Sequence, residues 1–200
     1  MIPCGKMLGR ALVFKRAAYF ADFVVCPAAI AALFAQAWRV SPQREAGDFG
    51  VALAVGVLAW TLAEYLLHRF VLHVLPPFRR LHELHHAAPR DLVGTPVWLS
   101  AALLFALFAL MNRFEDATVA CGVTAGVSIG YLAYVSLHCA VHHLPGLSWA
   151  WLRRLRRAHA VHHRSASPCN FGVSTPLWDV LFGTGAGDGP HPACPTTRDG

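Results

Sequence analysis

Four long apolar runs limit what this chain can fold into. They cover residues 17–38, 49–75, 95–111 and 117–143. Each run reaches or nearly reaches the ~20 residues that a helix needs to cross a bilayer. The third run is the shortest, so it could instead form a tight hairpin with the fourth. The pattern predicts an all-α integral membrane protein with about four transmembrane helices.

The charged residues are sparse and unevenly placed. With 56% hydrophobic and 14% charged residues, the chain is too apolar for a typical soluble domain. The net charge of +6 could suggest nucleic acid, but Lys and Arg concentrate in segments that flank the apolar runs. Four precede the first run, three lie in 76–94 and five in 144–164, whereas 39–48 has two and 112–116 has one. The positive-inside rule then places both termini and the middle loop in the cytoplasm, and we expect no nucleic-acid partner.

Histidines form a second pattern, in three tight clusters. The clusters are His82-x-x-His85-His86, His138-x-x-x-His142-His143 and His159-x-x-His162-His163, and they follow the pair His68 and His73. Positions i, i+3 and i+4 share one face of a helix, so each cluster can direct its imidazoles to one point. Imidazole is the commonest metal-ligating side chain and suits iron, copper, nickel and zinc alike. The clusters therefore predict a metal centre at one membrane face.

Ten histidines are the candidate metal ligands. They are His68, His73, His82, His85, His86, His138, His142, His159, His162 and His163. Ten ligands are too many for one ion, but two ions would share them at about five each and keep an open position for dioxygen or water. We therefore predict a dimetal site on a cytoplasmic helical cap. We predict no catalytic side chain separate from these ligands and no site for an organic cofactor.

Spacing leaves the roles of several residues near the clusters open. His68 and His73 lie five residues apart, about 140° around a regular helix, so they flank a cluster or the helix distorts between them. We expect each to serve a different metal. Glu64, one turn before His68, could accept an imidazole N–H or could reach the membrane interface as a free carboxylate. Asn170 and Asp179 raise the same question.

Capping signals predict two helices after the last apolar run. Ser148 is a suitable N-cap for a helix over 149–164, whose buried stripe changes from leucine to histidine. Thr175-Pro176 would open a shorter helix that extends through Phe182.

Other interpretations of the histidines are a solvated polar face, a structural zinc site and a bis-histidine haem site. Solvated faces rarely use histidine in place of Lys or Glu, and structural zinc is satisfied by four ligands. Haem needs facing histidines on the spans, whereas the pairs and triplets here crowd one end. A non-catalytic membrane protein that binds a metal or haem stays open as an alternative. We interpret His143 and His191 as satisfied polar residues outside the site.

The residues around the histidines resemble the fatty acid hydroxylase and sterol desaturase superfamily. Besides the three clusters, the resemblance rests on Glu64-Tyr-Leu-Leu-His68, Asn170-Phe-Gly-Val-Ser174 and Leu177-Trp-Asp-Val-Leu-Phe-Gly-Thr184. It spans about residues 64–184 and implies a membrane-bound, non-haem di-iron oxygenase with the ten histidines as ligands. The implied reaction is O2-dependent hydroxylation or desaturation of a fatty acid, acyl chain or sterol-like lipid. The implied cofactor is two iron ions, and zinc could replace them in a purified sample.

Two segments bear on the substrate and the electron source. The interval from His73 to His82 is similar to that of bacterial carotenoid ring hydroxylases, so a carotenoid ring is an alternative substrate. No segment before residue 64 resembles a fused cytochrome domain, so we expect a separate electron donor of cytochrome or ferredoxin type. The expected organisation is a tail and first membrane helix over 1–48, a catalytic domain over 49–184 and a disordered tail over 185–200.

Overall fold

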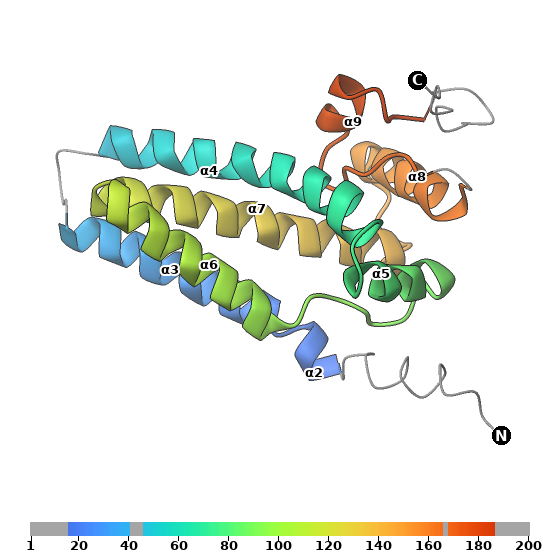
Figure 1. The fold of residues 1–200 in the computed structure, drawn as a ribbon, viewed down its shortest axis with the longest axis horizontal. Helices are drawn as coiled ribbons and strands as arrows, with labels where there is room; N and C mark the ends of the chain where they lie inside the picture. The colour runs from blue at the N-terminus through green and yellow to red at the C-terminus, as the bar shows by residue number, and fades with distance from the viewer. Residues whose placement is uncertain (1–15, 41–45, 166–167, 187–200) are drawn as a thin grey trace. The chain divides into compact units, whose positions relative to one another are not determined.

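The computed structural model describes residues 16–40, 46–165 and 168–186, and every regular element within these ranges is a helix (Figure 1). The α-helices are α2 (Arg16–Tyr19), α3 (Asp22–Val40), α4 (Ala46–Leu66), α5 (Phe78–Ala87), α6 (Val97–Phe114), α7 (Ala117–His143), α8 (Ala150–Arg164) and α9 (Leu177–Leu181). A π-helix, η1 (Leu67–Leu72), follows α4 directly. The prediction of an all-α fold is confirmed.

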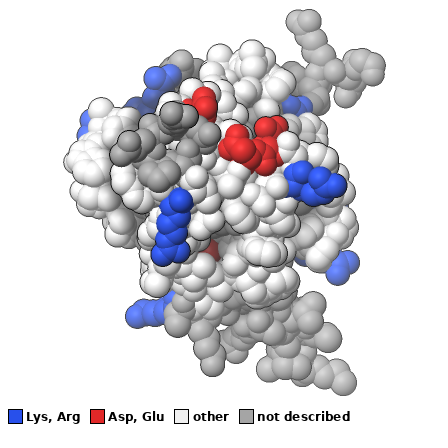
Figure 2. All heavy atoms as spheres, turned by 90° about the vertical axis from the view of Figure 1, so that its left-hand side faces the viewer, with Lys and Arg blue, Asp and Glu red and all other residues white. Residues whose placement is uncertain are grey.

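Four helices are long and apolar enough to cross a membrane. They are Asp22–Val40, Gly47–Leu72, Val97–Phe114 and Ala117–His143. The shortest apolar run becomes an 18-residue helix, so it too is long enough to span. Figure 2 looks onto the left-hand side of Figure 1, where several separate Lys and Arg side chains and a small group of Asp and Glu stand on an otherwise white surface. The prediction of four membrane helices is therefore confirmed.

The chain divides into two compact units. The first comprises Met1–Trp60 and Asp91–Leu132, and the second comprises Thr61–Arg90 and Ala133–Gly200. The division falls within helices α4 and α7, so each of these helices contributes to both units. All ten candidate ligands belong to the second unit.

The helices of the first unit are joined by a buried polar contact and by close backbone approach. α3 and α6 lie side by side (Figure 1), and the hydroxyls of Ser100 and Tyr131 each donate to the buried Asp22 carboxylate at 2.8 Å. A Cβ atom on Gly56 or Gly126 would lie within 2.3 Å of a carbonyl oxygen of the facing helix. α4 and α7 can approach this closely only because glycine has no side chain.

The second unit positions α8 against the end of α7. Ala140 and Val141 of α7 pack with Leu152 and Leu155 of α8 in a buried apolar cluster. This contact directs the leucine stripe of α8 inward, and the histidines that continue the stripe point the same way.

The Arg156 guanidinium also ties α8 to the end of α7. It donates to the carbonyl oxygens of Leu144 at 3.0 Å and Leu147 at 3.2 Å. The positive charge also lies next to the C-terminal end of α7, where the helix dipole favours a cation.

The capping prediction for α8 is wrong, whereas the short helix predicted after Thr175-Pro176 is present as α9, with Pro176 as its N-cap and its last residue at Leu181. Trp149 is the N-cap of α8 and no side chain caps this end; Ser148 instead accepts a hydrogen bond from Arg153 on its carbonyl oxygen. The hydroxyl of Thr175, just before the N-cap of α9, accepts the N–H of Leu177 at 3.2 Å. Residues 187–200 of the expected disordered tail lie outside the described residues.

Candidate metal centre

The ten histidines come from both chain segments of the second unit, Thr61–Arg90 and Ala133–Gly200, and lie close together in space. η1 and the residue after it carry His68 and His73, α5 carries the first triplet, α7 carries His138 and His142, and α8 carries the last triplet. Nine of the ten form two groups: His68, His73, His82, His86 and His162 in the first, and His85, His138, His142 and His159 in the second. Within each group the ligand atoms all lie within 4.8 Å of one another.

The π-helix brings His68 and His73 into the same group. Its hydrogen bonds run from i to i+5, so residues five apart lie close to one face. The two imidazole rings are stacked with their centroids 5.2 Å apart. Our expectation that they serve different metals is therefore wrong. The helix distorts between them, which was the other alternative that their spacing allowed.

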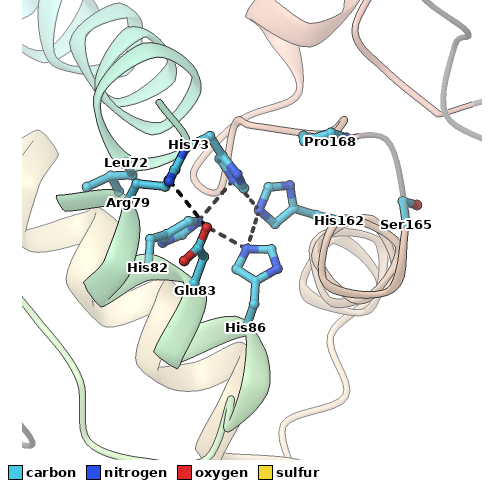
Figure 3. Close-up of a pocket in the computed structure, with 9 residues that line it drawn as sticks. All are labelled: Leu72, His73, Arg79, His82, Glu83, His86, His162, Ser165 and Pro168. Atoms are coloured by element: carbon cyan, nitrogen blue, oxygen red, sulfur yellow. Dashed lines mark hydrogen bonds and ion pairs between the residues drawn. The ribbon is translucent and has the colours of Figure 1, made fainter. Parts of the chain in front are cut away.

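The five imidazoles of the first group direct their Nε2 atoms toward a common centre. The Nε2 atom of His82 lies 3.0 Å from that of His68, 3.1 Å from that of His73 and 3.0 Å from that of His86. The Nε2 atom of His162 lies 3.2 Å from that of His73 and 3.0 Å from that of His86. Figure 3 shows four of these rings, from three separate elements, pointing toward one another.

Two backbone carbonyls decide which nitrogen of their imidazole partners carries the proton. Nδ1 of His68 lies 2.6 Å from the carbonyl oxygen of Phe171, and Nδ1 of His162 lies 2.6 Å from that of Cys169. A carbonyl oxygen only accepts, so each Nδ1 must donate. A neutral imidazole has one N–H, so both Nε2 atoms present lone pairs to the centre. That is the tautomer a metal ligand needs.

The second group brings Nε2 atoms from α5, α7 and α8 together. Within the described part of the chain, Nδ1 of His85 and of His159 lacks the backbone carbonyl partner that two rings of the first group have. Nε2 of His138 lies 3.1 Å from that of His85, and Nε2 of His142 lies 2.8 Å from that of His159. The tenth candidate, His163, lies beside this group, with its Nε2 atom 3.0 Å from that of His159. His143 belongs to neither group.

Burial keeps these imidazoles neutral near pH 7. Burial, together with the neighbouring imidazoles, lowers the pKa of His73 to about 4 and those of His162 and His163 to about 3. Burial also lowers the pKa values of His82 and His85. A histidine binds metal only in its neutral form. The centre therefore offers uncharged nitrogen donors, which suit iron, zinc or copper rather than the oxygen-preferring Mg²⁺ and Ca²⁺.

The Glu64 carboxylate does not serve as an imidazole acceptor. Its Oε1 atom accepts the backbone N–H groups of Val173 at 2.6 Å and Ser174 at 2.8 Å, and its Oε2 atom accepts the Ser174 hydroxyl. The carboxylate is buried, so these donors stabilise it. Glu64 therefore holds the segment 170–174 rather than a ligand.

Asp179 holds the same segment from the other side. Its carboxylate accepts the N–H of Phe171 at 2.8 Å, the N–H of Gly172 at 2.7 Å and the Thr184 hydroxyl at 2.7 Å. Asn170, with a φ of 52°, donates through its side chain to the carbonyl oxygen of Ala158 on α8. The sequence left the roles of these three polar residues open. In the structure they fix the backbone segment whose carbonyl oxygens orient His68 and His162.

Sequence reasoning missed the carbonyl groups of Cys169 and Phe171. A backbone carbonyl carries no residue-type signal, so histidine spacing could not identify it. The only sequence signal is the run Asn170-Phe-Gly-Val-Ser174, which contributed to the family resemblance without a stated role.

Replacing Asp179 by Asn is expected to loosen this segment. An amide has one oxygen acceptor, so its NH2 group would face at least one N–H or O–H donor that the carboxylate now accepts. We expect a loss of about 1–3 kcal/mol in the free energy of unfolding, together with a lower metal content after purification. Thermal unfolding and elemental analysis measure both. The exposed Asp91→Asn is the matched control, and equal behaviour of the two variants would contradict the role of Asp179.

Comparison with known proteins gives concordant matches. A family model described as fatty acid hydroxylase matches residues 53–184. The chain is 34% identical over 142 residues to fatty acid 2-hydroxylase of Rattus norvegicus. This match covers 65% of this chain and 38% of that protein. It is 33% identical over 147 residues to dihydroceramide fatty acyl 2-hydroxylase FAH2 of Arabidopsis thaliana, covering 68% and 61%. It is 37% identical over 148 residues to ceramide very long chain fatty acid hydroxylase SCS7 of Saccharomyces cerevisiae, covering 65% and 36%.

The same likeness extends to a solved structure. The structure of full-length scs7p, in which only the hydroxylase domain is visible, superposes with a TM-score of 0.74 at 27% sequence identity. The match covers 86% of this chain and 69% of that one. The chain spans less than two thirds of the length of each of the three relatives above.

Proposed function

The chain belongs to the fatty acid hydroxylase family, and on that premise we propose that it hydroxylates a C–H bond of a lipid acyl chain with dioxygen and external electrons. The observation that carries the proposal is the convergence of the histidines in two groups within a membrane protein. The relatives are described as hydroxylases of fatty acids and of the acyl chains of ceramides, most of them at C2. We therefore place the new hydroxyl on C2, the carbon next to the carbonyl.

Two iron ions are the proposed cofactors. The first histidine group would hold one ion, and the second group would hold the other with His163 as a further ligand. When bound, the iron pair would activate dioxygen for attack on an unactivated C–H bond. Zinc also prefers imidazole and could replace iron in a purified sample.

The chain's own residues position the imidazole ligands and set which of their nitrogen atoms carry protons. The carbonyls of Phe171 and Cys169 hold Nδ1–H on His68 and His162, so their Nε2 atoms stay available as ligands. Burial keeps protons off the other imidazoles. The helices α5, α7 and α8 fix the rings, so the geometry does not have to be assembled during turnover.

The proposed reaction needs electrons from another protein. One oxygen atom of O2 enters the C–H bond as a hydroxyl group and the other leaves as water. This balance consumes two electrons and two protons. We propose that a separate electron donor of cytochrome or ferredoxin type supplies the electrons.

We also propose an orientation and a domain boundary. The distribution of Lys and Arg supports placing both termini, the segment 76–94 and the histidine groups on the cytoplasmic side. His68 and His73 lie at the C-terminal end of the second span, and His138 and His142 at that of the fourth, so one orientation accounts for all four. Residues 49–184 would form the catalytic domain.

Lipid analysis of cells with and without the chain tests the function. The host should lack 2-hydroxy fatty acids and should be supplied with carotenoid in a parallel culture. We expect acid-hydrolysed lipids of expressing cells to contain 2-hydroxy fatty acids by mass spectrometry, because the acyl chain is the proposed substrate. Hydroxylated pigment without hydroxylated acyl chains would instead support the carotenoid alternative.

A further inference from the structure

The short helix α9 presents large apolar side chains on its outer face. Leu177, Val180 and Leu181 stand at positions i, i+3 and i+4, which share one side of a helix, and they are 48%, 75% and 65% exposed. Phe182, the next residue, is also exposed. Residues 170–184 contain one charged residue, Asp179, and its side chain is buried. An apolar surface of this kind marks a place where the protein meets lipid or another apolar partner.

α9 lies against the side of a membrane span. The indole N–H of Trp178 donates to the Thr61 hydroxyl of α4 at 3.0 Å, and the rings of Phe182 and Tyr65 are stacked with their centroids 5.3 Å apart. Thr61 precedes His68 by seven residues within the span Gly47–Leu72, which is about 10 Å of helix. The level of α9 is therefore that of the apolar part of the span, before its first histidine.

The surfaces near α9 divide in the same way. Leu66 and Leu67, which follow Tyr65 in the span, are 40% and 43% exposed, as expected of side chains that face lipid. The exposed charges lie on α8 instead, on the side opposite to its histidines: Arg153, Arg154, Arg157 and Arg164. This division is expected if α8 faces water or lipid head groups and α9 faces acyl chains.

The backbone around α9 donates its N–H groups within the chain. Residues 171–174, which precede the helix, donate to the buried carboxylates of Glu64 and Asp179. Phe182 and Gly183, which follow the helix and are exposed, donate to carbonyl oxygens of α9 at 2.9 Å and 3.4 Å. An exposed turn in water can donate to solvent, whereas backbone among acyl chains must find its partners in the protein. The hydrogen bonding of this segment therefore fits a place in the membrane.

We propose that α9 is embedded in the leaflet beside α4, with Leu177, Val180 and Leu181 among the acyl chains of membrane lipids. The lipid contact then holds the segment 170–184 against α4, in addition to Glu64 and Asp179. The same segment orients ligands of the first histidine group, so the bilayer itself supports the geometry of the candidate metal centre. The inference depends on the membrane spans and not on the proposed reaction.

Photolabelling from inside the bilayer tests where α9 lies. The purified full chain is placed in nanodiscs of phosphatidylcholine that contain a lipid with a diazirine on its acyl chain. Illumination attaches this lipid to side chains in contact with it, and mass spectrometry of peptides locates the label. We expect residues 177–182 to be labelled as strongly as the exposed side of the span α6, and the arginine side of α8 to stay unlabelled. A water-soluble diazirine, used in parallel, should label α8 and spare α9.

Substitutions at one exposed position test whether the lipid contact supports the fold. Val180→Gln is expected to lower the thermal unfolding midpoint in nanodiscs by about 5 °C, because an amide would enter acyl chains that offer no hydrogen-bond partner. Val180→Leu keeps the position apolar and should match the parent protein. Arg154→Gln places the same amide on the exposed side of α8 and should also leave the midpoint unchanged.

Other results would overturn the proposal in distinguishable ways. Label on residues 177–182 from the water-soluble reagent alone would place α9 in water. Label from neither reagent would show that protein, such as a second copy of the chain, covers the apolar face. A Val180→Gln midpoint equal to that of the parent would contradict a supporting role for lipid. None of these results bears on hydroxylation, which the lipid analysis of expressing cells tests separately.

Discussion

Replacing His162 by Ala is expected to abolish the hydroxylated product and to lower the metal content of the purified protein. His162 is buried, and its Nε2 atom lies 3.0 Å from that of His86 and 3.2 Å from that of His73. Loss of a residue that merely supports a ligand costs roughly 10–100-fold in metal affinity or activity, so loss of a ligand should cost at least as much. Product is measured by mass spectrometry of lipids and metal by elemental analysis.

His143→Ala is the matched control for this variant. His143 is also on the histidine-rich side of the second unit and half-buried, but it belongs to neither group. We expect it to keep both product and metal. A well-folded His162→Ala protein with full activity would contradict the ligand assignment.

Removing the metal is expected to lower the thermal unfolding midpoint by about 10 °C or more. The fixed tautomers of His68 and His162 direct lone pairs to the same centre, where without a cation they repel. A ligand at a thousand times its Kd contributes about 4 kcal/mol, and each kcal/mol is worth about 2–4 °C in a chain of this size. Thermal unfolding of chelator-treated and untreated protein in the same detergent measures the difference.

Adding metal ions back to the chelator-treated protein shows whether the lower midpoint comes from loss of bound metal or from damage by the chelator. Fe²⁺ or Zn²⁺ should restore the midpoint, because both accept imidazole ligands. Mg²⁺ at the same concentration should not, because it prefers oxygen donors. Equal midpoints before and after complete removal of metal would show that the histidine groups do not depend on a cation.

The membrane helices could be predicted from the sequence because the length of an apolar run sets the length of a span. The shortest run, 95–111, still became α6 (Val97–Phe114). The convergence of α8's histidines was also predictable, since the leucine stripe of that helix must face α7 and His159 and His162 continue the same stripe.

The rest depended on contacts that spacing does not encode. The joint placement of His68 and His73 needed a π-helix, whereas their spacing was read with the geometry of a regular α-helix. The partners of Glu64 are backbone N–H groups more than a hundred residues away. Such contacts depend on how the segment after α8 packs against α4. The pattern of side chains along the sequence does not reveal this packing.

Elemental analysis of the purified chain, combined with its optical spectrum, tests the central claim most directly. The two histidine groups predict two transition-metal ions per chain, iron in the active protein, and a spectrum without a Soret band. One metal ion or none per folded, active chain, or a Soret band that accounts for the bound iron, would contradict a centre that holds two ions.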